Sequence, residues 1–407
     1  MTEPEGVGND LTPEAMIERA RAMIPVLRQR ANDCEALRRV PDETVRDFLE
    51  AGFFRIIQPK RFGGYEFDLP TLVRCMIEIS RGCGSSGWVL SLTSAHTWWA
   101  AQYEPEAQEE LFADDGDLRF PLIFAPTGTA TPVDGGYDLN GVWNYASGCD
   151  LSNWLAVNAI VPDPNGGKVP LDLVVCIFRQ EDFEIVDNWH VMGLRGTGSK
   201  QAVVKSLRIP NRRALSLNAL DNGPPPGLVL HDNPFYGGPA SPIFFAEIAA
   251  VAVGIAKGAI DIFKERAWTK SSAFRPGEKL FENAGIQRRL AEATAELDAA
   301  EAMLLAEANA YMVLVGQRIP NGQTVTIEER ARMQLQLQNA VEMSANVVDS
   351  LFVAGGSSAL NEGEPLQRCF RDISALRTHY LMDGDRLQEN WGRMAFGLEP
   401  LHRTPGL

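Results

Sequence analysis

The spacing of apolar residues changes twice along this chain of 407 residues, and few folds accommodate such a change. Up to about residue 112, apolar side chains recur at helical spacing, for example at Ile17, Ala20 and Ile24. Between residues 119 and 209 they alternate with polar residues, as in half-buried strands, and from residue 243 the helical spacing returns. The sequence therefore predicts a β unit between two helical regions.

The predicted elements fall into consecutive domains. Strands are expected at 119–125, 137–146, 154–161, 171–178 and 201–209. A segment rich in glycine and proline separates them from long helices expected at 243–270, 282–316, 326–354 and 365–394. We predict an N-terminal helical domain at 1–115, a central antiparallel β domain at 116–220, a linker at 221–242 and a C-terminal helical bundle at 243–407.

The charge and cysteine content exclude several classes of function. Acidic residues outnumber basic ones by 53 to 38, and the net charge of −15 argues against nucleic-acid binding. We expect no membrane segment and no secretory signal, because no apolar run approaches about 20 residues and the N-terminus is acidic and polar. Six scattered cysteines without a C-x-x-C pair fit a cytoplasmic protein, and the five histidines show no metal-ligand spacing.

Three glycine-rich segments imitate known motifs in the wrong structural context. Residues 82–87 spell G-x-G-x-x-G, but helical spacing precedes them, so a turn between helices is predicted instead of a dinucleotide site. Residues 193–200 nearly spell a phosphate-binding loop, but they lie between strands and their lysine and serine are exchanged. Residues 355–359 imitate a hydrolase nucleophile elbow, with Asp372 and His379 downstream, but helical segments flank them.

Residues 136–154 carry the most informative pattern. Tyr137 and Leu139 alternate with polar residues, the Asn-Gly dipeptide at 140–141 predicts a hairpin turn, and the second strand ends at Ser147. By themselves these residues predict only a β-hairpin with an aromatic face.

Seven segments in order make the chain similar to a known family. They are LRRVPDETV with GFFRIIQPKRFGG, CGSSGWVLSLTSAHTWW, APTG at 125–128, the 136–154 hairpin, VMGLRGTGSKQAVV, LFVAGGSSAL and PLQRCFRDISALRTHY. Over residues 12–398 the chain resembles oxygenase components of two-component flavin monooxygenases, in particular the 3-hydroxy-9,10-secosteroid and 4-hydroxyphenylacetate hydroxylases. Their acyl-CoA dehydrogenase fold implies N-terminal helices, a central β-barrel and a C-terminal four-helix bundle.

The resemblance implies a reduced-flavin-dependent monooxygenase. Such an enzyme takes reduced FMN or FAD from a separate NAD(P)H–flavin reductase, binds O2 and hydroxylates an aromatic ring through a C4a-hydroperoxyflavin. The resemblance also implies a homotetramer or homodimer joined through the C-terminal helices, in which a neighbouring subunit reaches the nucleotide end of the flavin.

The resemblance assigns roles to single residues. Ser147 is expected to face flavin N5, where a hydroxyl slows the loss of hydrogen peroxide. His379 lies near the position of the catalytic Glu-Gly-Thr turn of acyl-CoA dehydrogenases, so the dehydrogenase base is absent and a histidine that handles protons is expected instead. His96 is expected to bind a phenolic hydroxyl of the substrate, and Trp88 to line the substrate pocket.

The resemblance also suggests the cofactor contacts, which are the backbone of one turn and two cations: Pro126, Thr127, Gly128, Lys270 and Arg275. Several phenol hydroxylases of the family have serines just before the Ala-Pro-x-Gly turn, whereas this chain has the apolar run 120–124. Leu122 in that run is expected to contact the substrate. A large hydrophobic aromatic, phenol-, indole- or polycyclic-like, is therefore favoured.

Three alternatives stay open at this point. An acyl-CoA dehydrogenase-like flavoprotein would hold oxidised FAD. An N- or S-oxygenase would use the same scaffold and the same oxygen chemistry. A helical scaffold without catalytic function would bind no flavin.

Overall fold

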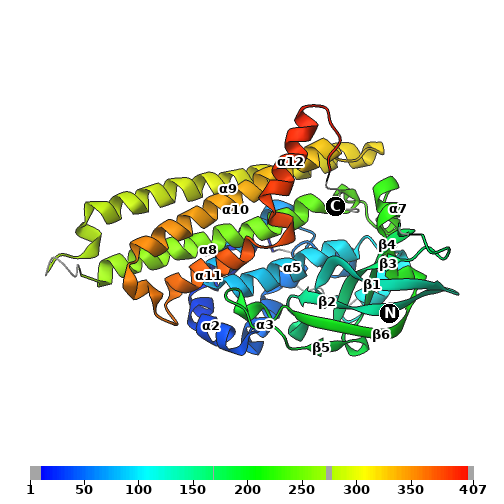
Figure 1. Cartoon of the computed structure of the whole chain (residues 1–407), viewed down its shortest axis with the longest axis horizontal. Coiled ribbons are helices and arrows are strands. Elements are labelled where there is room, and N and C mark those ends of the chain that lie inside the picture. The colour runs from blue at the N-terminus through cyan, green and yellow to red at the C-terminus, as the bar shows by residue number, and fades with distance from the viewer. Residues whose placement is uncertain (1–10, 168, 272–276, 402–407) are drawn as a thin grey trace.

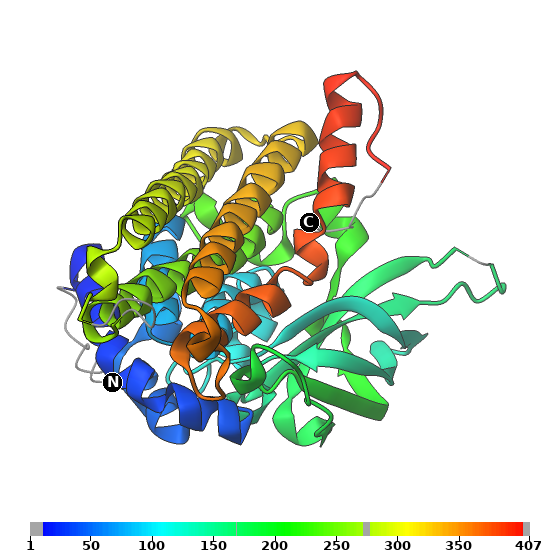
Figure 2. The same cartoon turned by 60° about the vertical axis from the view of Figure 1, so that its left-hand side comes forward.

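The computed structural model describes residues 11–167, 169–271 and 277–401. A β-sheet lies at one end of the molecule and long helices extend away from it, with the N-terminal helices packed along both (Figure 1). Figure 2 shows the same arrangement after rotation, with the long helices lying side by side next to the sheet. The two helical regions therefore share one core, although the sheet separates them in sequence.

The N-terminal region consists of six helices. They are α1 (Pro13–Ala22), α2 (Ile24–Leu37), α3 (Asp42–Ala51), α4 (Leu69–Gly82), α5 (Gly84–Ala100) and α6 (Pro105–Leu111). Asp68 caps α4 by accepting a hydrogen bond from the Thr71 amide. Only Cys83 separates α4 from α5, so the glycine pattern at 82–87 is a helix–helix turn, as predicted.

Seven strands form one sheet in the order β5-β6-β2-β1-β3-β4-β7. They are β1 (Leu122–Val133), β2 (Gly136–Ala146), β3 (Trp154–Val161), β4 (Asp172–Arg179), β5 (Glu184–Val186), β6 (Lys200–Pro210) and β7 (Ala214–Ser216). The sheet is not wholly antiparallel as expected, because β1 and β3 pair in parallel. Residues 193–200 connect β5 to β6, which confirms a turn between strands at that motif.

The predicted hairpin turn at residues 140–141 is wrong. Strand β2 runs straight through Asn140 and Gly141, and the turn that joins β1 to β2 is at Asp134 and Gly135. Gly141 is required for close packing, since a Cβ there would lie 2.6 Å from the Cα of Gly128. The Asn-Gly pair therefore marks close backbone contact and a shift in the β2–β6 register instead of a reversal of the chain.

After α7 (Leu217–Asn222) and two short 3-10 turns, the chain enters the C-terminal helices. These are α8 (Ser241–Thr269), α9 (Ala284–Arg318), α10 (Ile327–Ala354), α11 (Pro365–Leu376) and α12 (Gly384–Ala395). The single helix predicted at 365–394 is two helices, because the chain leaves α11 and makes a 3-10 turn at Tyr380–Met382. The Gly355–Ala359 segment lies between α10 and α11, in the helical context that was predicted.

Helix α8 is the central helix of the bundle. Both α8 and α9 are long and apolar enough to cross a membrane by length and composition, contrary to the expectation from the sequence. The most apolar window of α8 is 89% buried within the protein, whereas that of α9 is only 28% buried. Helix α8 therefore forms the core of the bundle, and α9 leaves apolar surface uncovered.

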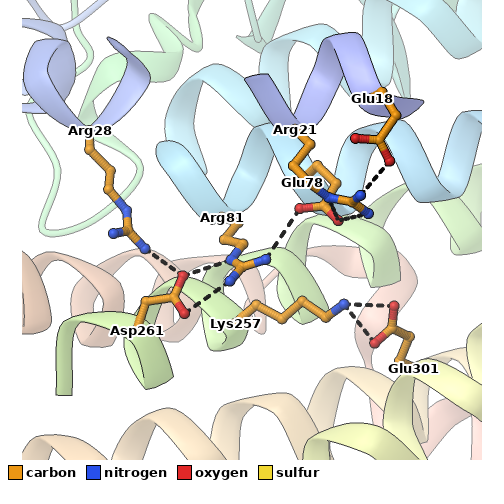
Figure 3. Close-up of polar contacts among 8 residues, drawn as sticks. All are labelled: Glu18, Arg21, Arg28, Glu78, Arg81, Lys257, Asp261 and Glu301. Atoms are coloured by element: carbon orange, nitrogen blue, oxygen red, sulfur yellow. Dashed lines mark hydrogen bonds and ion pairs between the residues drawn. The ribbon is translucent and has the colours of Figure 1, made fainter. Parts of the chain in front are cut away.

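Ion pairs connect the N-terminal helices to α8 (Figure 3). Arg28 of α2 and Arg81 of α4 both bind Asp261 of α8, each with a shortest N–O distance of 2.6 Å. Arg81 also contacts Glu78, which binds Arg21 of α1 at 3.0 Å. Arg21, Arg28, Arg81 and Asp261 border a cavity of about 530 Å³, and none of the predicted site residues that the structure describes lines it. The network holds helices together at a place separate from the predicted site.

Candidate active site

Ser147, Trp88 and His379 come together although they lie far apart in sequence. Ser147 directly follows β2, Trp88 lies in α5, and His379 follows α11. The indole Nε1–H of Trp88 donates a hydrogen bond to Ser147 Oγ at 3.1 Å. The rings of Trp88 and His379 meet edge to face, with 5.5 Å between their centroids. The structure thus brings three predicted site residues together, with Trp88 in contact with both Ser147 and His379.

The backbone next to Ser147 is shaped by positive φ angles. Tyr145 has φ 69° and Gly148 has φ 77°, a region that non-glycine residues rarely occupy. The Tyr145 side chain is 70% exposed, and its ring meets Trp189 edge to face at 6.1 Å. A strained, exposed tyrosine at this point is typical of functional sites, because the fold must hold it in a costly conformation.

The Ser147 hydroxyl begins a chain of buried hydroxyl groups. Ser147 Oγ lies 2.7 Å from Ser199 Oγ, which lies 2.6 Å from Thr197 Oγ1. Thr197 Oγ1 donates to the Leu194 carbonyl at 2.9 Å. Ser199 and Thr197 belong to the 193–200 turn, so this motif contributes side chains to the candidate site after all.

Asp372 of α11 holds the other end of that turn. Its Oδ1 accepts a hydrogen bond from the Leu194 amide at 2.7 Å, and the side chain is buried. Burial raises the pKa of Asp372 to about 7. The buried acid therefore connects the C-terminal helices to the turn beside Ser147.

One ring nitrogen of His379 binds the nearby backbone of the same turn. Its Nδ1 accepts a hydrogen bond from the Leu381 amide at 3.3 Å, and this capping contact starts the 3-10 turn after α11. The neutral ring consequently carries its proton on Nε2. The residue is half-buried, and burial lowers the pKa of His379 to about 4. His379 is thus a neutral donor at neutral pH.

His96 has the opposite tautomer. Its Nδ1 lies 2.7 Å from the Phe120 carbonyl oxygen, which only accepts, so Nδ1 carries the proton and Nε2 is the acceptor. Burial lowers the pKa of His96 to about 4. The ring packs against Phe120 and Phe244, with centroid distances of 5.4 and 5.9 Å. His96 is therefore a neutral acceptor within an aromatic cluster.

The aromatic cluster continues toward the start of β1. Phe124 and Trp99 pack against each other and against Phe244, with centroid distances between 5.4 and 5.8 Å. Leu122 lies two residues before Phe124 and is half-buried. The apolar run 120–124 thus borders His96, as a contact with a hydrophobic substrate requires.

The turn predicted to touch the flavin interrupts the pairing of β1 with β3. Ile123 pairs with Val157 and Gly128 with Ala159, so the residues between them bulge out of the ladder. Pro126 and Thr127 are exposed, and Thr127 Oγ1 donates to the Val142 carbonyl at 2.7 Å. Gly128 is buried against Trp143. This bulge offers accessible backbone beside β2, the strand that Ser147 directly follows.

Lys270, one of the two predicted phosphate ligands, lies at the opposite end of α8 from the residue that contacts His96. Lys270 follows α8, whereas Phe244, which contacts His96, lies near its start, and the helix rises roughly 40 Å between them. Lys270 donates to Ser358 at 3.1 Å and lies 3.9 Å from Glu364. Within one chain Lys270 therefore lies far from the aromatic cluster around His96, and its role as a phosphate ligand stays a prediction. Arg275 lies outside the described residues.

The donors and acceptors near Ser147 fit the ring system of a flavin. Ser147 has an acceptor position that Trp88 and Ser199 leave free, and exposed Tyr145 and the β1 bulge provide flat and polar surface. Sequence analysis missed Tyr145, Trp189, Thr197 and Ser199. The two small hydroxyls in the 193–200 motif were the available signal for the last pair, but the motif was interpreted only as a glycine-rich turn and as one of the segments that carry the family resemblance.

Comparison with known proteins adds the family context. Two family models match the chain: "Acyl-CoA dehydrogenase, N-terminal domain" over residues 14–112 and "Acyl-CoA dehydrogenase, C-terminal domain" over residues 246–384. The flavin-dependent monooxygenase, oxygenase subunit HsaA, of Rhodococcus jostii is 37% identical over 383 residues, which cover 94% of this chain and 98% of the relative.

Solved structures agree with these matches. The HsaA monooxygenase from M. tuberculosis has a TM-score of 0.88 and 34% identity, and the match covers 96% of this chain and 100% of that one. XiaF from Streptomyces, solved with FADH2 and glycerol, has a TM-score of 0.87 and 25% identity over 96% of this chain and 97% of its own. The predicted fold is confirmed, and so is the predicted resemblance.

Proposed function

Because the chain belongs to the oxygenase components of two-component flavin-dependent monooxygenases, we propose that its candidate site hydroxylates a hydrophobic phenol-, indole- or polycyclic-like substrate. Reduced FMN or FAD is supplied by a separate NAD(P)H–flavin reductase, and O2 is the second substrate. The observation that carries the proposal is the direct contact of Ser147, Trp88 and His379 beside an exposed bulge of β1.

The bound reduced flavin supplies the activation of oxygen, and the residues of this chain provide its surroundings. In this proposal Ser147 faces flavin N5, and Pro126, Thr127 and Gly128 lie along the edge of the ring. Trp88 supports Ser147 through its indole N–H. Lys270 and Arg275 stay the proposed phosphate ligands, and a neighbouring subunit is proposed to reach the nucleotide end of the flavin.

The two histidines have complementary roles in the proposed site. His96 offers the bare Nε2 atom, which accepts the proton of a phenolic hydroxyl in a hydrogen bond and increases the electron density of the ring. His379 offers an Nε2–H group, which donates to an oxygen near the flavin. Because burial lowers the pKa of both rings to about 4, these roles persist throughout the neutral range.

The substrate class follows from the apolar surroundings of His96. Phe120, Leu122 and Phe124 replace the polar residues that a small polyhydroxylated phenol would need, and Phe244 and Trp99 extend the apolar surface. A polar ring without apolar substituents would leave this surface uncovered. A larger hydrophobic aromatic is therefore the proposed substrate.

We further propose that the chain assembles into a homotetramer or homodimer in the cytoplasm. The apolar window of α9 is only 28% buried, and Val313 on that helix is 56% exposed. A second copy would cover this surface. The six cysteines form no disulfide, which suits a reducing compartment.

Activity with externally supplied reduced flavin tests the proposal. The purified chain is mixed with photoreduced FMN or FAD, oxygen and a panel of hydrophobic phenols and indoles, and products are separated by chromatography with mass detection. Hydroxylated product without added NAD(P)H is expected. A chain that retains oxidised FAD during purification, and whose FAD is bleached by acyl-CoA without hydroxylation, would instead be a dehydrogenase.

A further inference from the structure

The hydroxyl chain behind Ser147 fixes the direction in which Ser147 can form hydrogen bonds. We propose that Thr197 and Ser199 are positioning residues that hold Ser147 as a hydrogen-bond acceptor toward the flavin, so that the site prefers reduced over oxidised flavin. This inference rests on the proposed placement of Ser147 at flavin N5. It gives the 193–200 turn a role in selecting the redox state of the cofactor.

The direction follows from counting protons along the chain. The Leu194 carbonyl can only accept, so the hydroxyl proton of Thr197 is used there, at 2.9 Å. Thr197 must then accept from Ser199, at 2.6 Å, and this uses the proton of Ser199. Ser199 must in turn accept from Ser147, at 2.7 Å. The single hydroxyl proton of Ser147 is therefore directed away from the flavin.

Trp88 fixes the other side of Ser147. An indole N–H only donates, so the contact of 3.1 Å occupies one lone pair of Ser147 Oγ. With its proton on Ser199 and one lone pair on Trp88, Ser147 keeps a single free position, and that position is an acceptor. Burial of Ser147, Ser199 and Thr197 keeps water from supplying alternative protons, since each is at most 6% exposed.

The fixed end of the chain is itself held from two directions. The Leu194 amide donates to Asp372 at 2.7 Å, and the Trp189 indole donates to the Leu194 carbonyl at 3.2 Å. Leu194 has φ 52°, so this peptide is held in a conformation that a free turn would rarely adopt. The acceptor that sets the direction of the whole chain is therefore a rigid part of the fold.

The two redox states of a flavin differ at the atom that Ser147 would face. Reduced flavin carries an N5–H donor, whereas N5 of oxidised flavin is only an acceptor. An acceptor-only Ser147 pairs with the reduced form and leaves two acceptors facing each other in the oxidised form. Such a mismatch in a buried site is costly, so oxidised flavin is released and the reduced flavin delivered by the partner is retained.

Four proteins test the inference by flavin binding alone. They are the wild type, Thr197→Val, Ser199→Ala and the conservative control Thr197→Ser. Dissociation constants for oxidised and photoreduced FMN and FAD are measured anaerobically for each. Removing the Thr197 hydroxyl lets Ser199 donate to Ser147, and removing that of Ser199 takes away the acceptor for the Ser147 proton. In both variants Ser147 becomes free to donate to oxidised N5.

We expect the preference for reduced flavin to fall by about three- to tenfold in Thr197→Val and Ser199→Ala, because one hydrogen bond changes direction. Thr197→Ser keeps the hydroxyl and should retain the preference of the wild type. An unchanged ratio of the two dissociation constants in Ser199→Ala would overturn the inference, and so would an equal loss of the preference in Thr197→Val and Thr197→Ser. In either case, flavin binding by the wild type would leave the proposed function intact. A wild type that binds neither flavin would overturn both.

Discussion

At the scale of single residues, the site depends on where each proton lies. His96 and His379 have similarly lowered pKa values but opposite tautomers, because His96 Nδ1 faces a carbonyl and His379 Nδ1 faces an amide. Local backbone contacts alone therefore make one histidine an acceptor and the other a donor. Ser147 has the same kind of constraint through Trp88 and Ser199.

Replacing Ser147 with alanine should increase the release of hydrogen peroxide relative to hydroxylated product. The change removes the acceptor at flavin N5, and the loss of one hydrogen bond predicts an increase of about two- to tenfold. Peroxide and product are both measured per reduced flavin consumed. Unchanged coupling between flavin oxidation and product formation would remove Ser147 from the proposed position.

Protonation of His96 should lower stability in acid. The pKa of His96 is about 4 in the fold against about 6.5 in an unfolded chain, so between these values the unfolded state binds more protons and stability rises with pH. The contribution is complete above pH 6.5 and is lost as the pH falls toward 4, by an amount on the order of 3 kcal/mol.

The comparison with His96→Asn isolates this contribution, because Asp372 and His379 titrate in both proteins. The difference in free energy of unfolding between wild type and variant, measured by denaturant titration, should shrink from pH 7 to pH 4. A difference that stays constant over this range would show that His96 does not titrate as a buried histidine.

At the scale of elements, α5 brings the site together because it crosses α4 closely. A Cβ on Gly87 would lie 2.0 Å from Ser80 Oγ and 2.8 Å from Ser80 Cα, so only glycine fits at this crossing. The next residue of α5, Trp88, contacts both Ser147 and His379. The position of the site thus depends on the packing of α4 against α5.

Gly87→Ala should destabilise the protein by about 1–3 kcal/mol through overpacking. Gly392→Ala in α12 is the matched control, since nothing lies within 4 Å of an added Cβ there. The control should be neutral or should stabilise by up to about 1 kcal/mol, as expected for alanine in a helix. Denaturant unfolding at one pH measures both variants. Equal effects would contradict the close crossing.

The sequence predicted the kinds of elements better than their contacts. Nearly continuous apolar segments located α5, β3 and α8, which are buried on almost all sides. The sequence also predicted a turn at residues 140–141, where Gly141 instead allows close approach to Gly128, since glycine serves both purposes. The helix predicted at 365–394 ends at α11 because His379 caps a new turn, which is a tertiary feature.

The candidate site was predictable only in part. Resemblance identified Ser147, His379 and Trp88, and the structure brings these three together. It could not identify Thr197 and Ser199 as partners of Ser147, because hydrogen bonds between two turns far apart in the sequence leave no periodic pattern. Lys270 stays a prediction, because it contacts Ser358 and lies at the end of α8 remote from His96.

At the scale of the whole molecule, the sheet carries one wall of the site and the helical core carries the other. β2 and the 193–200 turn supply hydroxyls, while α5, α8 and the segment after α11 supply the aromatic and histidine side chains. The ion pairs of Figure 3 join α1, α2 and α4 to one another and to α8. The apolar window of α9 is only 28% buried, and we propose that a second copy of the chain covers it.

Val313→Glu should weaken the assembly of subunits. Val313 is 56% exposed on α9, and a buried carboxylate at an interface between copies is costly. Val169→Glu is the control, because Val169 is 78% exposed in the connection between β3 and β4. Light scattering coupled to size-exclusion chromatography should give a lower mass only for Val313→Glu. The same mass in both variants would place the contact between copies elsewhere.

The most direct test of the account is the origin of the oxygen atom in the product. The purified chain, photoreduced flavin and a hydrophobic phenol that it converts are mixed under ¹⁸O2 without reductase or NAD(P)H, and the product is weighed by mass spectrometry. The account predicts one ¹⁸O atom in each product molecule and none when the label is in the water. Product labelled from water, or oxidation without any incorporated oxygen, would contradict a flavin-dependent monooxygenase.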